Sequence, residues 1–132
     1  MRPKVFIPQP IPEGAVNRLK QVADVEVFPY IDRVISREEL LKSVKGKNYL
    51  YALAEIPFPA EVIDTALPDL KGIAAMYIFP KFVDIKTATE RGIPVTGIPN
   101  MLVETTAEFT FALLIGTAWR LPEGDRVMRK KQ

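Results

Sequence analysis

The sequence predicts an α/β fold built on a parallel sheet. Short apolar segments alternate along the chain with longer segments whose apolar residues recur at helical spacing. Residues 72–78 are apolar on both faces, which is typical of a parallel strand covered by helices above and below. Alternating strands and helices imply right-handed crossovers between parallel strands. Five such strands with helices on both faces make a flavodoxin-like, doubly wound sheet.

The pattern places each element in turn. We expect strands at residues 4–7, 24–30, 48–54, 72–78 and 93–96. The helices between them are expected at residues 13–23, 36–46, 59–68 and 84–92, and a long C-terminal linker helix at residues 104–119. Because Pro122 and Gly124 break the helical pattern, we expect one domain over residues 1–120 and a basic C-terminal tail over residues 121–132.

Helix boundaries carry local signals. Ser36 and Glu39 have the spacing of a capping box, in which each side chain bonds to the other residue's backbone amide. Asp84 is expected to cap a second helix through its carboxylate. Gly46 and Gly92 are expected to end these two helices, because glycine tolerates the left-handed conformation found there.

Composition excludes several classes of function. A chain of 132 residues with 48% hydrophobic and 26% charged residues is that of a folded domain, and a net charge of +2 gives no reason to expect nucleic acid as a partner. There is no cysteine and no histidine, so we expect no metal site and no histidine acid or base. The absence of a long apolar run favours the cytoplasm and no membrane partner. Twelve prolines favour a thermophile.

One stretch of the sequence is more informative than the pattern of strands and helices. Residues 84–115 read DIKTATERGIPVTGIPNMLVETTAEFTFALLI, and residues 70–74 read LKGIA. Both resemble the substrate-binding domain of the NAD-dependent D-2-hydroxyacid dehydrogenase family, which includes glyoxylate, hydroxypyruvate and phosphoglycerate dehydrogenases. In that family a dinucleotide-binding domain follows, whereas this sequence continues with RLPEGDRVMRKKQ. The resemblance implies a truncated dehydrogenase-like protein.

The chemistry of hydride transfer is missing from the sequence. The seven glycines never assume the GxGxxG spacing that binds a pyrophosphate at a helix N-terminus. In the family, the acid/base, its carboxylate partner and the arginine that grips the substrate belong to the missing domain or the segment after it. We therefore expect no catalytic residue, no stand-alone activity and no cofactor for this chain alone, although the family uses NAD or NADP.

The resemblance implies a vestigial substrate site. Its residues are Ala54, Tyr77, Ile78 and Phe79, and glycine is expected where Tyr77 and Phe79 stand, because backbone amides there must approach a carboxylate. Either the pocket has been altered for another ligand, or the two rings fill the anion site. Thr105 and Thr106 correspond to a hydroxyl that reaches the cofactor across the cleft, or else they cap the long helix.

The long helix favours self-association. Its large apolar residues cannot all face one sheet at helical spacing, which predicts a homodimer through Phe109, Leu113 and Trp119. The alternative is that the helix is buried within its own domain.

Three functions remain open at this point. The first is a truncated dehydrogenase domain without activity of its own. The second is a non-enzymatic binding module in which Tyr77 and Phe79 contact a ligand or partner. The third is a subunit of a split dehydrogenase whose dinucleotide-binding domain is a separate chain.

Overall fold

The computed structural model describes residues 2–53, 56–76, 82–98 and 102–130. The chain divides into two compact units, Met1–Ile98 and Pro99–Gln132, which we call unit 1 and unit 2. The boundary falls before the long helix, which therefore belongs to unit 2. Each unit is described by itself.

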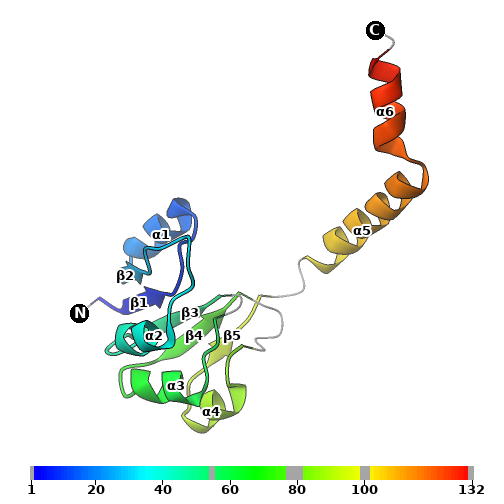
Figure 1. Cartoon of the computed structure of the whole chain (residues 1–132). Helices are drawn as coiled ribbons and strands as arrows, with labels where there is room; N and C mark the ends of the chain where they lie inside the picture. Colours follow the sequence, from blue (N-terminus) through cyan, green and yellow to red (C-terminus); the bar gives the residue numbers. More distant parts are fainter. Residues whose placement is uncertain (1, 54–55, 77–81, 99–101, 131–132) are drawn as a thin grey trace. The chain divides into compact units, whose positions relative to one another are not determined.

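Unit 1 is built on a five-stranded parallel sheet (Figure 1). Its strands are β1 (Lys4–Ile7), β2 (Asp24–Val27), β3 (Tyr49–Ala52), β4 (Gly72–Ala75) and β5 (Val95–Thr96). They lie in the order β2-β1-β3-β4-β5, and every pairing is parallel. This order and the α/β alternation confirm the predicted flavodoxin-like fold class.

Strand β1 has its predicted bounds, whereas the other four strands are assigned over fewer residues than the apolar runs that predict them. The expected strand at 24–30 ends at Val27, because Phe28 makes the last ladder bond, from its amide to Ile7 O at 2.9 Å, and Pro29 has no amide to continue the ladder. Beyond β4, the amide of Met76 donates to Ala52 O at 3.0 Å, and residues 77–78 of the expected strand lie outside the described residues.

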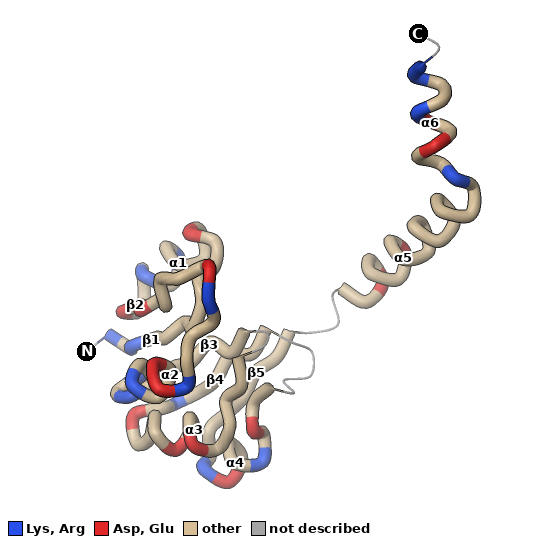
Figure 2. Tube along the Cα trace, in the orientation of Figure 1, with Lys and Arg blue, Asp and Glu red and all other residues tan. Residues whose placement is uncertain are grey.

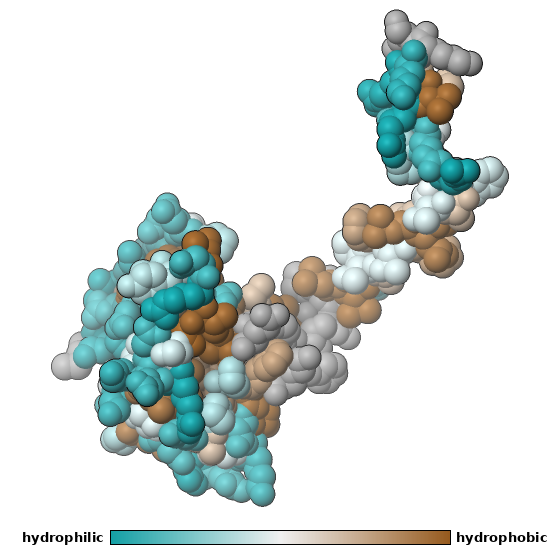
Figure 3. Space-filling view, viewed as in Figure 1, coloured by the Kyte–Doolittle hydropathy of each residue, from teal (hydrophilic) through white to brown (hydrophobic). Residues whose placement is uncertain are grey.

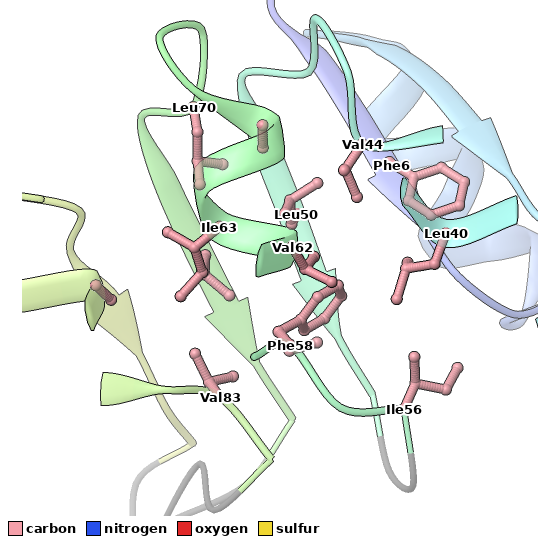
Figure 4. Packing of buried hydrophobic residues seen from close by; sticks show 14 of the residues in the cluster. Phe6, Leu40, Val44, Leu50, Ile56, Phe58, Val62, Ile63, Leu70 and Val83 are labelled. Atoms are coloured by element: carbon pink, nitrogen blue, oxygen red, sulfur yellow. The ribbon is translucent and has the colours of Figure 1, made fainter. Parts of the chain in front are cut away.

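Helices cover one face of the sheet more fully than the other. The helices α2 (Arg37–Ser43), α3 (Ala60–Ala66) and α4 (Ile85–Glu90) share one cluster of buried residues with the sheet (Figure 4). On the opposite face, α1 (Glu13–Lys20) leads into a smaller cluster that contains Val5, Ile7 and Leu53. Burial of these apolar residues is the main source of stability in such a domain.

The predicted helix boundaries of α2 and α4 are confirmed. In α2, Glu39 N donates to Ser36 Oγ at 3.3 Å and Ser36 N donates to Glu39 Oε2 at 3.0 Å, which completes the capping box. At the start of α4, Thr87 N donates to Asp84 Oδ1 at 3.0 Å. Gly46 and Gly92 follow these helices with φ of 68° and 69°, in the left-handed region.

Unit 2 consists of α5 (Val103–Ala118) and α6 (Leu121–Arg129). The expectation of a broken pattern after Trp119 is wrong, since residues 121–129 form a second helix. Pro122 lies in the first turn of α6, where a missing amide breaks no hydrogen bond, and the turn is made by Arg120 with φ of 51°. Helix α6 carries both acidic and basic residues, whereas the charges of α5 are acidic and lie near its N-terminus (Figure 2).

Among the described residues, no helix combines the length and the apolar character needed to cross a lipid bilayer.

Candidate functional site

The carboxyl ends of β1 and β3 mark the place where a ligand is expected. The chain leaves β1 toward β2 on one side, and every later strand is added on the other side of β1. Strand order therefore reverses between β1 and β3. In open α/β sheets, ligands bind outside the carboxyl ends of the strands at such a reversal.

The segments that follow β3 and β4 are tied to each other at this edge. Phe58 N donates to Phe82 O at 2.7 Å, and Asp84 N donates to Phe58 O at 3.0 Å. These bonds form a parallel bridge between Phe58 and Val83, and Phe58 itself is fully buried. Leu53 and Ile56 are buried as well, so the loop after β3 is anchored at both ends.

In the sequence, the predicted substrate residues fall between these anchored positions. Ala54, Tyr77, Ile78 and Phe79 lie outside the described residues. The structure fixes the residues on either side of them, and these lie next to one another across β3 and β4. Both loops therefore start from neighbouring positions at the carboxyl edge of the sheet.

A second feature of this edge is a hollow at the ends of β1 and β2. It has a volume of about 360 Å³ and is lined by Gln9, Pro10 and residues 30–34. Within it, the Arg33 guanidinium lies 4.8 Å from the ring centre of Phe28 and 4.3 Å from that of Tyr30. The two rings meet edge to face at 5.3 Å.

Arg33 is already occupied by a protein partner. Its Nη1 and Nη2 donate to the two carboxylate oxygens of Glu39 at 2.8 and 2.7 Å. Hydrogen bonds from Arg33, and then from the Ser36 backbone, lower the pKa of Glu39 well below its usual 4.5, and the same contact raises the pKa of Arg33. The charges of Arg33 and Glu39 cancel, which leaves no free charge for a ligand. We therefore interpret the cluster as a structural clamp between the loop after β2 and the start of α2.

Sequence reasoning missed this cluster. The only local signal is the spacing of Phe28, Tyr30 and Arg33. That spacing does not predict the contact of Arg33 with Glu39, which forms only in the folded protein.

Buried acid–base chemistry is absent from the part of the chain that the structure describes. No charged or polar side chain is buried in it, and no three acidic residues come together as metal ligands. Among the described carboxyl groups, the pKa is lowered for Glu39 and Asp84, which both lie at helix starts. Asp84 is the N-cap of α4, and the Thr87 backbone amide and then its hydroxyl lower the pKa of its carboxyl group.

The first turn of unit 1 does not fit a dinucleotide. A pyrophosphate needs free backbone amides at a helix N-terminus that follows a strand. Here Pro8, Pro10 and Pro12 remove three amides between β1 and α1, Pro12 is the N-cap, and Glu13 adds a negative charge in the first turn. No step of a reaction can be assigned to a cofactor bound at this turn.

The remaining predicted site residues belong to α5. Thr105 and Thr106 lie exposed in its first turns, and neither caps it, since the N-cap is Leu102 and makes no side-chain bond. Phe109, Leu113 and Trp119 are 64%, 56% and 77% exposed, and none of the described residues of unit 2 is buried. Apolar side chains lie on the visible surface of α5 (Figure 3).

Comparison with known proteins assigns this architecture to a family. The family model "D-isomer specific 2-hydroxyacid dehydrogenase, catalytic domain" matches residues 5–117, a range that takes in the predicted substrate loops. This chain belongs to the D-isomer specific 2-hydroxyacid dehydrogenase family. The resemblance seen in residues 84–115 is thereby confirmed.

Individual members of the family match along nearly the whole chain. A glyoxylate reductase of Thermofilum pendens is 40% identical over 131 residues, and one of Thermococcus kodakarensis is 42% identical over 129 residues. Among solved structures, the TT0316 protein of Thermus thermophilus superposes with a TM-score of 0.79 at 38% identity, over 96% of this chain and 40% of that one.

Each match covers nearly all of this chain but less than half of the relative. The two reductases match 99% and 98% of this chain, whereas the match takes up 38% of each relative. The 132 residues thus span about two fifths of the length of the curated relatives.

Proposed function

We propose that these 132 residues form the substrate-binding half of a glyoxylate reductase-like dehydrogenase, which acts on a small 2-hydroxy or 2-keto acid. The observation that carries this proposal is the 40% identity to a glyoxylate reductase over 99% of the chain. It is supported by a sheet in which β3 and β4, the strands that precede the two candidate segments, are neighbours.

Hydride transfer then requires a part that this sequence does not contain. The turn after β1 is unsuited to a pyrophosphate, and the described residues supply no buried acid or base. We expect NAD or NADP to be held by a dinucleotide-binding domain, either on a separate chain of a split dehydrogenase or elsewhere in a longer polypeptide. The chain alone is inactive on this proposal.

Reconstitution tests the proposal directly. The purified chain is mixed with the part of the Thermococcus kodakarensis reductase that lies outside its 129 aligned residues, which we call the complementing polypeptide. We expect no oxidation of NADH or NADPH with glyoxylate from either component alone, and turnover from the mixture. Turnover by the chain alone contradicts the proposal, and so does a mixture that neither associates nor turns over.

The rings of Tyr77 and Phe79 favour a second candidate, a binding module for a different ligand. The resemblance puts glycine at both positions. The double variant Tyr77→Gly/Phe79→Gly separates the two functions in the reconstituted mixture. Higher turnover of glyoxylate by the variant than by the natural chain indicates a dehydrogenase site filled by the rings. Inactivity of both mixtures, despite association, favours the binding module.

We also propose that α5 forms a homodimer. Phe109 and Leu113 are one helical turn apart and share a stripe, with Trp119 at the end of the helix, and all three are exposed in unit 2. Equilibrium sedimentation at micromolar concentration is expected to show a dimer that the variant Phe109→Glu disrupts. Ala107→Glu is the control, because it lies about 160° around the helix from Phe109. A monomeric natural chain contradicts the dimer.

A further inference from the structure

The loop between β2 and α2 exposes large apolar side chains. Ile31 is 90% exposed, and Tyr30 and Val34 are exposed as well. A single exposed isoleucine is ordinary, but three large apolar side chains within five residues form a patch, and such patches mark contact surfaces. We call residues 30–34 the apolar loop.

The clamp around Arg33 holds the apolar loop in place. Its guanidinium donates two hydrogen bonds to Glu39 and lies against two aromatic rings. The charge of Arg33 is therefore satisfied within the protein, while Ile31 and Val34 remain exposed. A loop that is fixed before binding loses little conformational entropy when a partner arrives. The clamp thus preorganises the apolar loop for contact.

Beside the apolar loop lies a hollow between the starts of α2 and α3. It has a volume of about 270 Å³, and we call it the α2–α3 hollow. Leucine, isoleucine and valine side chains on the α2–α4 side of the sheet form part of its lining (Figure 4). The buried lining residues are Ile35, Leu40, Ile56 and Val62. Arg37 also lines the hollow, and it forms an ion pair with Glu61.

The loop and the hollow are adjacent parts of one surface, because Val34 belongs to both. Two copies related by a two-fold axis can therefore place the apolar loop of each in the hollow of the other, which makes an isologous contact. A water takes about 30 Å³ of liquid. A hollow of about 270 Å³ thus has room for the four carbon atoms of an isoleucine side chain.

The charges near this surface fit contact with a second copy. A two-fold axis brings like residues of the two copies close together, so free charges of one sign would repel each other. Arg33 and Arg37 are each neutralised by a glutamate of their own chain. Asp32, the other charged residue of the apolar loop, is exposed and can remain in water at the rim of the contact.

We propose that the apolar loop and the α2–α3 hollow together form a contact surface between two copies of this chain. Ile31 of each copy enters the α2–α3 hollow of the other. Unit 1 carries this contact, so it is separate from the contact proposed for α5 and independent of the proposed reaction. It involves few side chains and is therefore weak. At high protein concentration it joins α5 dimers into larger species.

Equilibrium sedimentation of the Phe109→Glu variant isolates this contact from that of α5. We expect the variant to be monomeric at micromolar concentration and to dimerise as the concentration approaches millimolar. Adding Ile31→Glu is expected to weaken this dimerisation at least about tenfold, because a carboxylate in the hollow is buried without a partner. The matched control is Val22→Glu, an exposed valine outside the apolar loop, and it is expected to have no effect.

Two results of this experiment overturn the proposal. One is a Phe109→Glu variant that stays monomeric at the highest concentration. The other is dissociation by Val22→Glu without an effect of Ile31→Glu, which places the contact beside α1. Circular dichroism establishes that each variant is folded.

Cross-linking tests the geometry, because the natural chain contains no cysteine. Ile31→Cys and Val34→Cys are prepared as separate proteins and mixed with oxidised glutathione. Since Ile31 of one copy enters a hollow that Val34 of the other lines, we expect their mixed disulfide to form at least about fivefold faster than that between Ile31→Cys and Val22→Cys. Equal rates overturn the proposal. Neither experiment depends on turnover, so the proposed function stands or falls separately.

Discussion

Phe58 joins two parts of unit 1 that are distant in the sequence. Its backbone bonds to Phe82 and Asp84, and its ring is fully buried in the cluster shared by the sheet and α2–α4 (Figure 4). The same residue thus joins the two segments that follow the candidate substrate residues in the sequence. Its backbone makes the bridge, and its side chain belongs to the core.

We therefore expect Phe58→Ala to reduce the free energy of unfolding by about 3–5 kcal/mol, through lost transfer energy and the cavity left behind. Urea denaturation followed by circular dichroism measures the change. Glu38→Ala, an exposed substitution, is expected to stay within about 0.5 kcal/mol. A loss for Phe58→Ala no larger than that of the control contradicts its role in the core.

Glycine residues give a paired test at the same scale. Gly92 has φ of 69° with open space around it. An added Cβ therefore contacts no neighbouring atom, and its only cost is backbone strain. Gly92→Ala is expected to lower the free energy of unfolding by about 1–2 kcal/mol. Gly14 lies in α1 with φ outside the left-handed region and with equally open space, so Gly14→Ala is expected to raise it by about 0.4–1 kcal/mol. Equal signs for the two variants contradict this explanation.

At the scale of elements, the start of α2 is joined to the loop after β2 by charge. Glu39 completes the capping box with Ser36 and accepts two hydrogen bonds from Arg33, which itself stacks on Phe28 and Tyr30. Arg37 and Glu61 form an ion pair between α2 and α3, and Arg91 and Asp64 form one between α3 and α4. These contacts are exposed, so they fix geometry more than they add stability.

The pH dependence of stability follows from the lowered pKa of Glu39. The folded protein holds this carboxylate ionised more strongly than the unfolded chain does, so its stabilising effect is complete at neutral pH. The effect is lost as the pH falls below about 4.5 toward the folded-state pKa. Urea midpoints measured from pH ~5 to pH ~3 should fall more steeply for the natural chain than for Glu39→Gln. Glu38→Gln serves as the control, and identical slopes for the natural chain and Glu39→Gln contradict the assignment.

At the scale of the whole molecule, the sequence carries features of thermostable proteins. It has twelve prolines and no cysteine, and its relatives include reductases of Thermofilum and Thermococcus. We expect a thermal unfolding midpoint above the ~45–65 °C that is common for mesophile domains. Differential scanning calorimetry measures the midpoint, and a value within that range contradicts a thermophile source.

The same scale shows where sequence reasoning failed. A tail is expected after Trp119 when Pro122 and Gly124 are read as helix breakers. The structure has α6 there instead, since Arg120 makes the turn and Pro122 occupies a first-turn position that tolerates it. The clamp around Arg33 escapes sequence reasoning because its partners meet only after the loop has folded back.

The structure does not describe the predicted substrate residues. Ala54, Tyr77, Ile78 and Phe79 remain predictions, since they lie outside the described residues. The resemblance alone assigns them, and the structure contributes the anchored segments on either side.

The sequence by itself determined the fold class, the starts and ends of α2 and α4, and the family, because periodicity, caps and motifs are properties of neighbouring residues. Only the tertiary structure decided which distant groups meet: the strand order, the clamp around Arg33 and the bridge at Phe58. Such contacts depend on how segments pack across many residues of intervening chain. No local pattern specifies them, because the free energy that selects them is gained only when separate elements bury their surfaces together.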